Sequence, residues 1–306
     1  MEILVAGGTG FIGTNLCAEL AERGHEVTAL SRSPDRDGLP DGVETAIGDV
    51  SASDSIAATV ADHDTVVNLV SLSPLFEPPS GTSHEEVHLG GTENLVHAAE
   101  DGDVDRFLQL SALGADPNGD TAYIRAKGQA EQVVRDSSLA WTIVRPSVVF
   151  GDGGEFVDFT KTLTTPYVTG LPGGGKTRFQ PIWVGDLVPI LADALDDDTH
   201  VGETYEIGGP QVLTLADVTE LAYEAEGKDV TIVPIPMGLA RVGLSAAGPL
   251  PFVPFGPDQA RSLAFDNTVV DNDVTAFGRD PSELTTLGSY LGLERAPRGA
   301  KPAGTA

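Results

Sequence analysis

Apolar residues in this chain follow two alternating patterns that predict strands and helices in turn. Short runs rich in Val, Ile and Leu are typical of strands buried on both faces, whereas apolar residues three and four apart are typical of helices packed on a sheet. The runs predict strands at residues 2–6, 26–31, 43–47, 65–70, 106–111, 139–145 and 204–207. The helical pattern covers residues 11–23, 85–100, 123–137, 185–195 and 215–226. This alternation predicts an α/β fold with a doubly wound parallel sheet.

The first predicted strand runs directly into a glycine-rich turn, Gly-Gly-Thr-Gly-Phe-Ile-Gly, and then into the first predicted helix. Gly7, Gly10 and Gly13 permit a tight turn, a close approach of backbone to a pyrophosphate and close packing of helix on strand. The start of the helix adds free N–H groups and a positive dipole end, which suit phosphate. The order of strand, glycine turn, helix and second strand predicts a dinucleotide site rather than an ordinary glycine-rich turn. The candidate residues in this loop are Gly7, Thr9, Gly10, Phe11, Ile12 and Gly13.

Further cofactor-binding candidates follow the carboxyl ends of later strands, where ligands of open parallel sheets bind. They are Ser31, Arg32, Asp49, Val50, Leu69, Val70, Ser71 and Pro146. Arg32 decides the expected coenzyme, because arginine pairs with the 2′-phosphate of NADP, whereas an acid at this point would accept hydrogen bonds from the ribose of NAD. We therefore expect NADP(H), with NAD(H) as the alternative if Arg32 is only a solvated loop residue. Asp49 is either a contact of the adenine or the cap of a short helix that begins near residue 53.

Tyr123 and Lys127 stand four residues apart at the start of a predicted helix and therefore share one helical face. An ammonium near the phenol lowers the pKa of the tyrosine from about 10, and such a tyrosine can give and take a proton. The pair alone is equally typical of a surface helix, but its position after the fifth strand of a nucleotide-binding sheet points to chemistry. His88 and His97 have no further ligands at metal spacing, so we expect ordinary helix histidines and no metal site.

Together these motifs resemble the short-chain dehydrogenase/reductase superfamily. The likeness is carried by the glycine turn, Gly48-Asp49-Val50, Gly91-Thr-Glu-Asn-Leu95, Tyr123-x-x-x-Lys127 and Val144-Arg-Pro-Ser-Val-Val-Phe-Gly151. Residues 110–116, 123–127, 141–147 and 257–270 are most similar to the atypical branch, which includes the nucleotide-binding accessory subunit of respiratory complex I and its prokaryotic relatives. The resemblance covers nearly the whole chain, to about residue 292.

This resemblance implies a Rossmann-type domain that holds NADP(H), with Tyr123 as proton donor or acceptor and Lys127 orienting the nicotinamide ribose. The expected domain comprises residues 1–150 with a re-entry at about 180–208, and residues 151–179 with 209–295 form a smaller substrate-side α/β domain. A serine usually completes this set in the superfamily, and Ser111 is the candidate here. The chain departs from the superfamily at Ala112 and Leu113, one and two residues further on, where relatives tend to place the working hydroxyl. This departure bears on turnover by Ser111 more than on cofactor binding, because the phosphate cradle does not depend on that hydroxyl.

Three functions are open at this point. The first is an oxidoreductase that passes hydride between nicotinamide and a carbonyl or alcohol of an unidentified small molecule. The second is an accessory or assembly protein of a respiratory complex or quinone pathway, in which the nucleotide is structural or a redox sensor. The third is a sugar-nucleotide epimerase or dehydratase, which would normally use NAD.

The charge of the chain is far from neutral, since 46 acidic and 18 basic residues give a formal charge of −28 and a pI of about 4.3. The acids are spread over predicted loops and helix faces, which is typical of a folded surface rather than of a disordered tail. Such a surface repels nucleic acid and anionic membranes and resembles that of cytosolic proteins from salt-accumulating halophiles. We therefore expect a cytoplasmic protein of a high-salt cytosol, peripheral to a membrane only through a partner. The one cysteine, Cys17, excludes an intrachain disulfide and fits a reducing compartment.

Two patterns in the second half of the chain suggest a phosphate loop and a membrane-spanning helix, and the surrounding residues argue against both. Residues 170–177 match the letters of a phosphate loop, G-x-x-x-x-G-K-[ST], but prolines stand where a buried strand and a helix would be needed, so we expect a mobile loop. Residues 230–255 are apolar but interrupted by prolines and glycines, which excludes a continuous membrane-spanning helix. We expect them to pack the smaller domain, with an isoprenoid-binding, quinone-binding or partner surface as the alternative. Residues 296–306, rich in Pro, Gly and Ala, should form a flexible tail.

Overall fold

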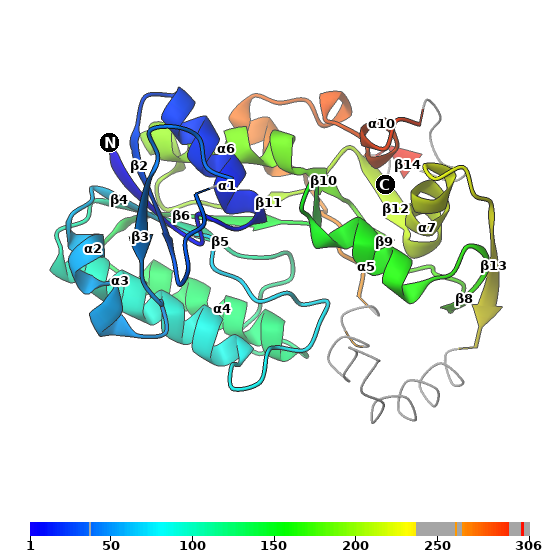
Figure 1. Cartoon of the computed structure of the whole chain (residues 1–306), viewed down its shortest axis with the longest axis horizontal. Helices are drawn as coiled ribbons and strands as arrows, with labels where there is room; N and C mark the ends of the chain where they lie inside the picture. Colours follow the sequence, from blue (N-terminus) through cyan, green and yellow to red (C-terminus); the bar gives the residue numbers. More distant parts are fainter. Residues whose placement is uncertain (37, 237–260, 262–264, 294–300, 303–306) are drawn as a thin grey trace. The chain divides into compact units, whose positions relative to one another are not determined.

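The computed structural model describes residues 1–36, 38–236, 261, 265–293, 301 and 302. The chain separates into two compact units. Helices and strands are named below by their labels in Figure 1. Unit 1 comprises Met1–Leu72, Pro78–Pro146 and Leu187–Tyr205, and unit 2 comprises Ser73–Glu77, Ser147–Asp186 and Glu206–Ala306.

Unit 1 is built on a seven-stranded parallel sheet in the order β11-β6-β5-β4-β1-β2-β3. Its strands are β1 (Glu2–Ala6), β2 (Glu26–Ser31), β3 (Glu44–Ile47), β4 (Thr65–Asn68), β5 (Arg106–Leu110), β6 (Ala140–Pro146) and β11 (Thr204–Ile207). The chain proceeds from β1 outward to β3 and then crosses to β4 on the other side of β1. The order therefore reverses between β1 and β4, and the predicted doubly wound sheet is confirmed.

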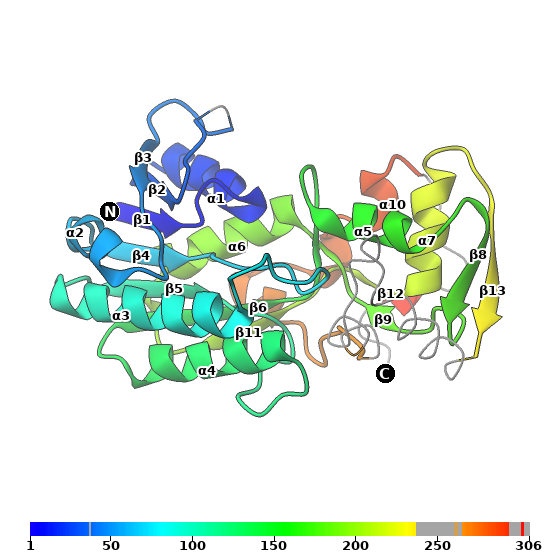
Figure 2. The same cartoon turned by 60° about the horizontal axis from the view of Figure 1, so that its bottom comes forward.

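Helices cover both faces of this sheet, with α1 and α6 on one face and α2, α3 and α4 on the other (Figures 1 and 2). Their bounds are α1 (Phe11–Glu22), α2 (Ala57–Ala61), α3 (Gly91–Asp101), α4 (Ala122–Asp136) and α6 (Val184–Asp196), with short 3₁₀ turns η1 (Ser53–Ser55) and η3 (Asp198–His200). A π-helical stretch, η2 (Glu85–Gly90), continues directly into α3. At the start of α4 the Thr121 hydroxyl accepts a hydrogen bond from the N–H of Ile124, which caps the helix that carries Tyr123.

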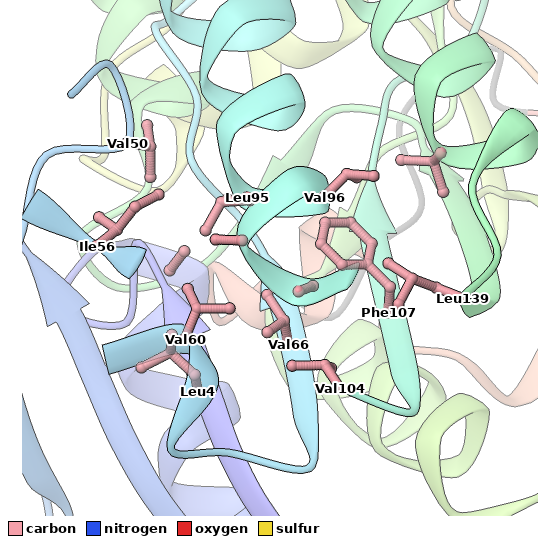
Figure 3. Packing of buried hydrophobic residues seen from close by; sticks show 14 of the residues in the cluster. Leu4, Val50, Ile56, Val60, Val66, Leu95, Val96, Val104, Phe107 and Leu139 are labelled. Carbon is pink, nitrogen blue, oxygen red and sulfur yellow. The ribbon is translucent and has the colours of Figure 1, made fainter. Parts of the chain in front are cut away.

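An apolar core fixes the register of the central strands (Figure 3). Leu4, Val66 and Phe107 are fully buried and stand side by side on β1, β4 and β5. Leu95 and Val96 of α3 pack on the same core. Burial of side chains of this size stabilises the fold by about 1.5–3 kcal/mol each. The carboxyl ends of these strands are therefore held at one edge of the sheet.

Unit 2 combines short paired strands with short helices. Its elements are β7 (Val149–Phe150), α5 (Glu155–Leu163), β8 (Tyr167–Pro172), β9 (Arg178–Phe179), β10 (Ile182–Trp183), β12 (Gln211–Thr214), α7 (Leu215–Glu224), β13 (Val230–Ile235), η4 (Asp273–Phe277), η5 (Pro281–Glu283), α10 (Leu287–Tyr290) and β14 (Lys301–Pro302). β8 pairs in parallel with β13, and β12 pairs antiparallel with β9 and β14. Thr214 and Asp217 form a capping box at the start of α7, because each side chain accepts a hydrogen bond from the backbone N–H of the other.

The observed elements differ from the predicted ones in a few places. The strands predicted at residues 65–70 and 106–111 end at Asn68 and Leu110. After β4, the Asn68 side chain accepts the N–H of Val70 at 3.1 Å and replaces a strand partner. Residues 170–172, which were expected in a loop, belong to β8.

Some predicted segments lie outside the described residues. These are residues 237–255 of the apolar stretch, residues 257–260 and 262–264 of the stretch similar to the atypical branch, and the expected tail apart from β14. In the described part of the chain, no helix combines the length and apolar character that crossing a membrane requires.

Candidate functional site at the strand ends of unit 1

The glycine turn after β1 is held by its own backbone. The N–H of Gly7 donates to the Leu30 carbonyl at 2.9 Å, and the N–H of Gly10 donates to the Gly7 carbonyl at 3.0 Å. A Cβ atom at position 13 would lie 2.1 Å from the Gly7 oxygen, so only glycine lets α1 start this close to the turn. No side chain caps α1, and its first N–H groups are left to bind an anion.

Gly8 is a constrained residue that the motif spacing does not single out. A Cβ atom there would lie 2.7 Å from the Cβ of Ala29 and 2.8 Å from the carbonyl oxygen of Val5. The contact with Ala29 comes from β2, a separate element, and this part of the constraint cannot be inferred from the local sequence. Cys17 is buried beneath this turn, with its thiol 3.7 Å from the Gly8 oxygen, and burial raises its pKa to about 12. This cysteine is a packing residue and a poor nucleophile.

The end of β2 presents a buried hydroxyl and an exposed cation. The Ser31 hydroxyl has no hydrogen-bond partner among the described residues, although its oxygen is buried. An unpaired buried polar group costs about 1–3 kcal/mol, which a ligand oxygen at this point would recover. The next residue, Arg32, is exposed.

Asp49 follows β3 and stabilises a turn. Its carboxylate accepts the N–H of Ser51 at 2.9 Å, whereas the residue that precedes η1 is Ala52. The alternative that Asp49 caps a helix near residue 53 is therefore wrong. The buried residue Val50 is tied to α3, because its carbonyl accepts the side-chain amide of Asn94 at 2.8 Å.

A buried polar network lies under the end of β4. The Asn68 amide donates to the Thr92 hydroxyl at 3.1 Å and to the Gln109 side chain at 3.0 Å. The Thr92 hydroxyl donates in turn to the carbonyl of His88. This network ties β4, β5 and the π-helical stretch together below Leu69, Val70 and Ser71, all three of which follow β4.

Tyr123 and Lys127 lie on the first two turns of α4. The Lys127 ammonium donates to the Leu110 carbonyl at 3.0 Å, and the residue is only 2% exposed. Burial lowers the pKa of Lys127 to about 8, with Glu131 acting in the opposite direction. Burial raises the pKa of Tyr123 to about 12, against the lowering effect of a hydrogen bond with Ser71. The expectation that Lys127 lowers the pKa of Tyr123 is therefore wrong, because burial dominates both groups and the ammonium is directed to a carbonyl.

Two histidines that the sequence did not assign to the site lie beside Tyr123. The ring centroids of His84 and His88 are 5.5 and 5.3 Å from that of Tyr123, in edge-to-face arrangements. The N–H of Leu72 donates to Nε2 of His88 at 3.2 Å, which leaves the ring proton on Nδ1. That Nδ1 is buried and has no partner among the described residues.

His88 is a neutral imidazole. Burial, followed by the nearby Lys127 and His84, holds the pKa of His88 far below its ordinary value. The available sequence signal was the spacing of His84 and His88, four residues apart on a helix that must pack on its neighbours. His97, by contrast, is exposed and lies 3.5 Å from Asp101, as expected for a surface residue. In the part of the chain that the structure describes, no cluster of three or more His, Cys, Asp or Glu side chains could hold a metal.

Ser111 is the first residue after β5, and Pro146 is the last residue of β6. The backbone N–H of Ser111 donates to the Val144 carbonyl at 2.7 Å, and its hydroxyl is buried without a partner in the described chain. Ala112 and Leu113 are buried next to it, and the N–H of Leu113 donates to the Pro146 carbonyl. The candidate residues thus follow β1 to β6 at one edge of a parallel sheet, on both sides of the point where the strand order reverses.

A family model described as NAD(P)H-binding matches residues 7–165, which is just over half of the chain. The chain belongs to the NAD(P)H-binding family. The match begins at the glycine turn and extends past Tyr123, Lys127 and Pro146, so the residues singled out above fall within the region that defines the family. The resemblance to short-chain dehydrogenases/reductases is confirmed.

Proteins similar to this NAD(P)H-binding chain include a respiratory-complex subunit, a steroid dehydrogenase and a sugar-nucleotide epimerase. Subunit 9 of the NADH dehydrogenase [ubiquinone] 1 alpha subcomplex from Arabidopsis thaliana mitochondria is 30% identical and aligns over 88% of this chain and 71% of the relative. A 3 beta-hydroxysteroid dehydrogenase/Delta 5→4-isomerase of Mycobacterium tuberculosis is 28% identical, over 74% of this chain and 70% of the relative. Among solved structures, UDP-glucose 4-epimerase of Thermus thermophilus in complex with NAD shares the fold with a TM-score of 0.64. It is 24% identical, over 86% of this chain and 97% of the epimerase.

Proposed function

We propose that this chain is an NADP(H)-dependent oxidoreductase that acts on a carbonyl or alcohol group of a small molecule. The observation that carries the proposal is the placement of Tyr123 and Lys127 on α4, where Lys127 bonds to Leu110 at the carboxyl end of β5, in the same sheet as the strand that leads into the glycine turn. A proton-transferring phenol and a coenzyme cradle at one edge of one sheet are what hydride transfer to a carbonyl requires.

The residues present fit a nicotinamide dinucleotide. The cradle at Gly13 admits no side chain, and the buried hydroxyls of Ser31 and Ser111 have no partner among the described residues. Arg32 next to Ser31 favours the 2′-phosphate of NADP over the bare ribose of NAD. It therefore also disfavours an NAD-using epimerase, and oxidised NAD retained by the purified protein would restore that alternative.

The reduced coenzyme would supply a hydride to the carbonyl carbon. As the C=O electron pair moves to oxygen, the phenol of Tyr123 gives its proton to that oxygen, and an alcohol results. Lys127, whose pKa is lowered by burial to about 8, would orient the nicotinamide ribose. Tyr123 then recovers its proton from water.

The experiment measures NADPH oxidation by wild-type protein and by Tyr123→Phe with a panel of aldehydes and ketones. We expect Tyr123→Phe to bind NADPH like the wild type and to turn over at least about 100-fold more slowly, because it lacks the proton donor. Equal turnover of any reduced substrate by the two proteins would show that Tyr123 has no proton role.

A second candidate, favoured by the Arabidopsis relative, is an accessory subunit of a respiratory complex. In that function the nucleotide would be structural or a redox sensor, and the partner would be the membrane complex. Purification of the tagged chain from native membranes would retrieve respiratory subunits in stoichiometric amounts. A chain that is recovered active and without such partners would contradict this candidate.

A further inference from the structure

Ser71, three residues beyond the end of β4, gives Tyr123 a hydroxyl neighbour. Ser71 is exposed, its hydroxyl donates to the Leu72 carbonyl at 3.3 Å, and a hydrogen bond with Ser71 acts to lower the pKa of Tyr123. Ser111 differs, because its hydroxyl is buried and unpartnered within the described residues. Ala112 and Leu113 carry no hydroxyl at all. An accessible hydroxyl next to Tyr123 is therefore supplied by the segment after β4 rather than by the segment after β5.

The backbone around Ser71 is fixed on both sides. The N–H of Val70 donates to the Asn68 side chain at 3.1 Å, and the N–H of Leu72 donates to Nε2 of His88 at 3.2 Å. The same His88 ring lies edge-on to Tyr123, with 5.3 Å between the ring centroids. One imidazole thus contacts both the segment that carries Ser71 and the ring of Tyr123.

Two features indicate that His88 has more than a packing role. Its Nδ1–H is buried without a partner among the described residues, a cost that phenylalanine or leucine would avoid. It also lies in a π-helical stretch, and such stretches are rare and frequently occur at functional sites.

We propose that Ser71 is a further catalytic residue, which donates a hydrogen bond to the same substrate oxygen that Tyr123 protonates, and that His88 is the positioning residue that holds the two hydroxyls together. This inference rests on the proposed oxidoreductase function. During carbonyl reduction the oxygen gains an electron pair, takes the Tyr123 proton with one lone pair and accepts the Ser71 hydrogen bond with another. Ser71 loses no proton in the cycle.

The first test does not depend on turnover. Tyrosines labelled with ¹³C at Cζ report hydrogen bonding of the phenol in an NMR spectrum, and Tyr123→Phe identifies the Tyr123 signal by its loss. We expect Ser71→Ala to shift this signal and Ser111→Ala to leave it in place. Ser80→Ala, an exposed serine in the same connection, is the matched control. A Tyr123 signal unmoved by Ser71→Ala would overturn the proposal.

The second test measures NADPH oxidation with para-nitrobenzaldehyde as the probe. We expect Ser71→Ala to lower kcat about 100-fold, as the loss of one preorganised donor does, with an unchanged KM for NADPH. Ser71→Thr should restore much of the rate, and Ser80→Ala should keep all of it. Full kcat in Ser71→Ala would contradict the catalytic role.

The positioning role of His88 is tested separately. We expect His88→Asn to lower kcat and to shift the Tyr123 Cζ signal, while His97→Asn, on the exposed face of α3, changes neither. A His88→Asn protein with wild-type signal and rate would refute it. If the wild type does not reduce the aldehyde, the proposed function fails in this form, while the NMR signal still decides whether Ser71 is the partner of Tyr123.

Discussion

A single methyl group at position 13 would lie 2.1 Å from the carbonyl oxygen of Gly7, closer than any real Cβ contact. Gly13→Ala should therefore push α1 away from the turn, lower the free energy of unfolding by about 1–3 kcal/mol and abolish coenzyme binding. Gly38→Ala is the control, because its Cβ would meet only the Thr14 methyl at 3.6 Å. Urea unfolding and NADPH titration measure both effects. Wild-type coenzyme affinity in Gly13→Ala would contradict this account of the cradle.

Lys127 makes a second prediction at the scale of one residue. Its pKa is lowered to about 8 in the folded chain, compared with about 10.4 in an unfolded one. The unfolded state thus binds the proton more tightly, so the charged lysine destabilises the fold fully below about pH 8 and progressively less up to about pH 10.4. The stability gained in Lys127→Met should fall by roughly 2 kcal/mol between about pH 7 and about pH 10. Urea unfolding at both pH values tests this, with the exposed Lys176→Met as a control that shows no such change.

Individual residues were predictable from sequence where the constraint is local. Gly7, Gly10 and Gly13 follow from spacing within one turn, and Tyr123 and Lys127 from spacing within one helix. Gly8 and His88 were not predictable, because Ala29 of β2 restricts the first and Tyr123 of α4 contacts the second. Ser71 was placed with the coenzyme by its strand, and its hydrogen bond with Tyr123 depends on a distant helix.

At the scale of elements, α4 is anchored to β6 by a buried carboxylate. Glu131 accepts hydrogen bonds from Arg145 at 2.6 and 2.8 Å and from Arg135 at 2.9 Å, and its side chain is only 1% exposed. Glu131→Gln would remove the buried negative charge that pairs with Arg145 and Arg135, so we expect a loss of about 2–4 kcal/mol in unfolding free energy. Glu93→Gln, on the exposed face of α3, should change stability by less than about 0.5 kcal/mol. Equal unfolding free energies of the two variants would show that Glu131 does not anchor α4 to β6.

The phosphate-loop letters at residues 170–177 give another prediction for one element. The end of β8 leads into three glycines with positive φ, Gly173, Gly174 and Gly175, and the chain then enters β9 instead of a helix. Without a helix N-terminus after the loop, the backbone cannot cradle phosphates as a P-loop does. Magnesium-ATP should therefore give no thermal protection, and Lys176→Ala should melt like the wild type. ATP protection that is lost in Lys176→Ala would reverse this interpretation.

Strand bounds were predictable to within one residue where an apolar run meets a turn signal, as at residues 26–31. Strand bounds were not predictable where a polar side chain accepts a hydrogen bond from a nearby backbone N–H, as Asn68 does at the end of β4. The π-helical form of residues 85–90 was also not predicted, because the apolar spacing indicates a helix without fixing its hydrogen-bond pattern.

At the scale of the whole molecule, the net charge of −28 sets the response to salt. Acidic residues on a folded surface repel one another, and molar salt shortens the Debye length to roughly 3 Å. The melting temperature should therefore rise steadily as KCl increases from about 0.05 M to about 1 M. A neutral osmolyte at equal osmolality should give a smaller rise. A melting temperature independent of KCl would show that surface repulsion does not limit stability.

The parallel sheet of unit 1 was predictable as a whole, because alternating strands and helices in this order allow few topologies. The pairing of β9, β12 and β14 in unit 2 was not, because these strands are only two to four residues long and carry no periodic pattern.

Titration of the wild-type chain with NADPH and with NADH in molar KCl, followed by coenzyme fluorescence, tests the central claim most directly. We expect saturable binding of both at one site, with NADPH tighter by about tenfold, a difference of about 1.4 kcal/mol. Arg32→Ala should remove that preference and leave NADH binding unchanged. If neither coenzyme binds, the glycine turn is no dinucleotide cradle in this chain, and the proposed chemistry has no coenzyme to act with.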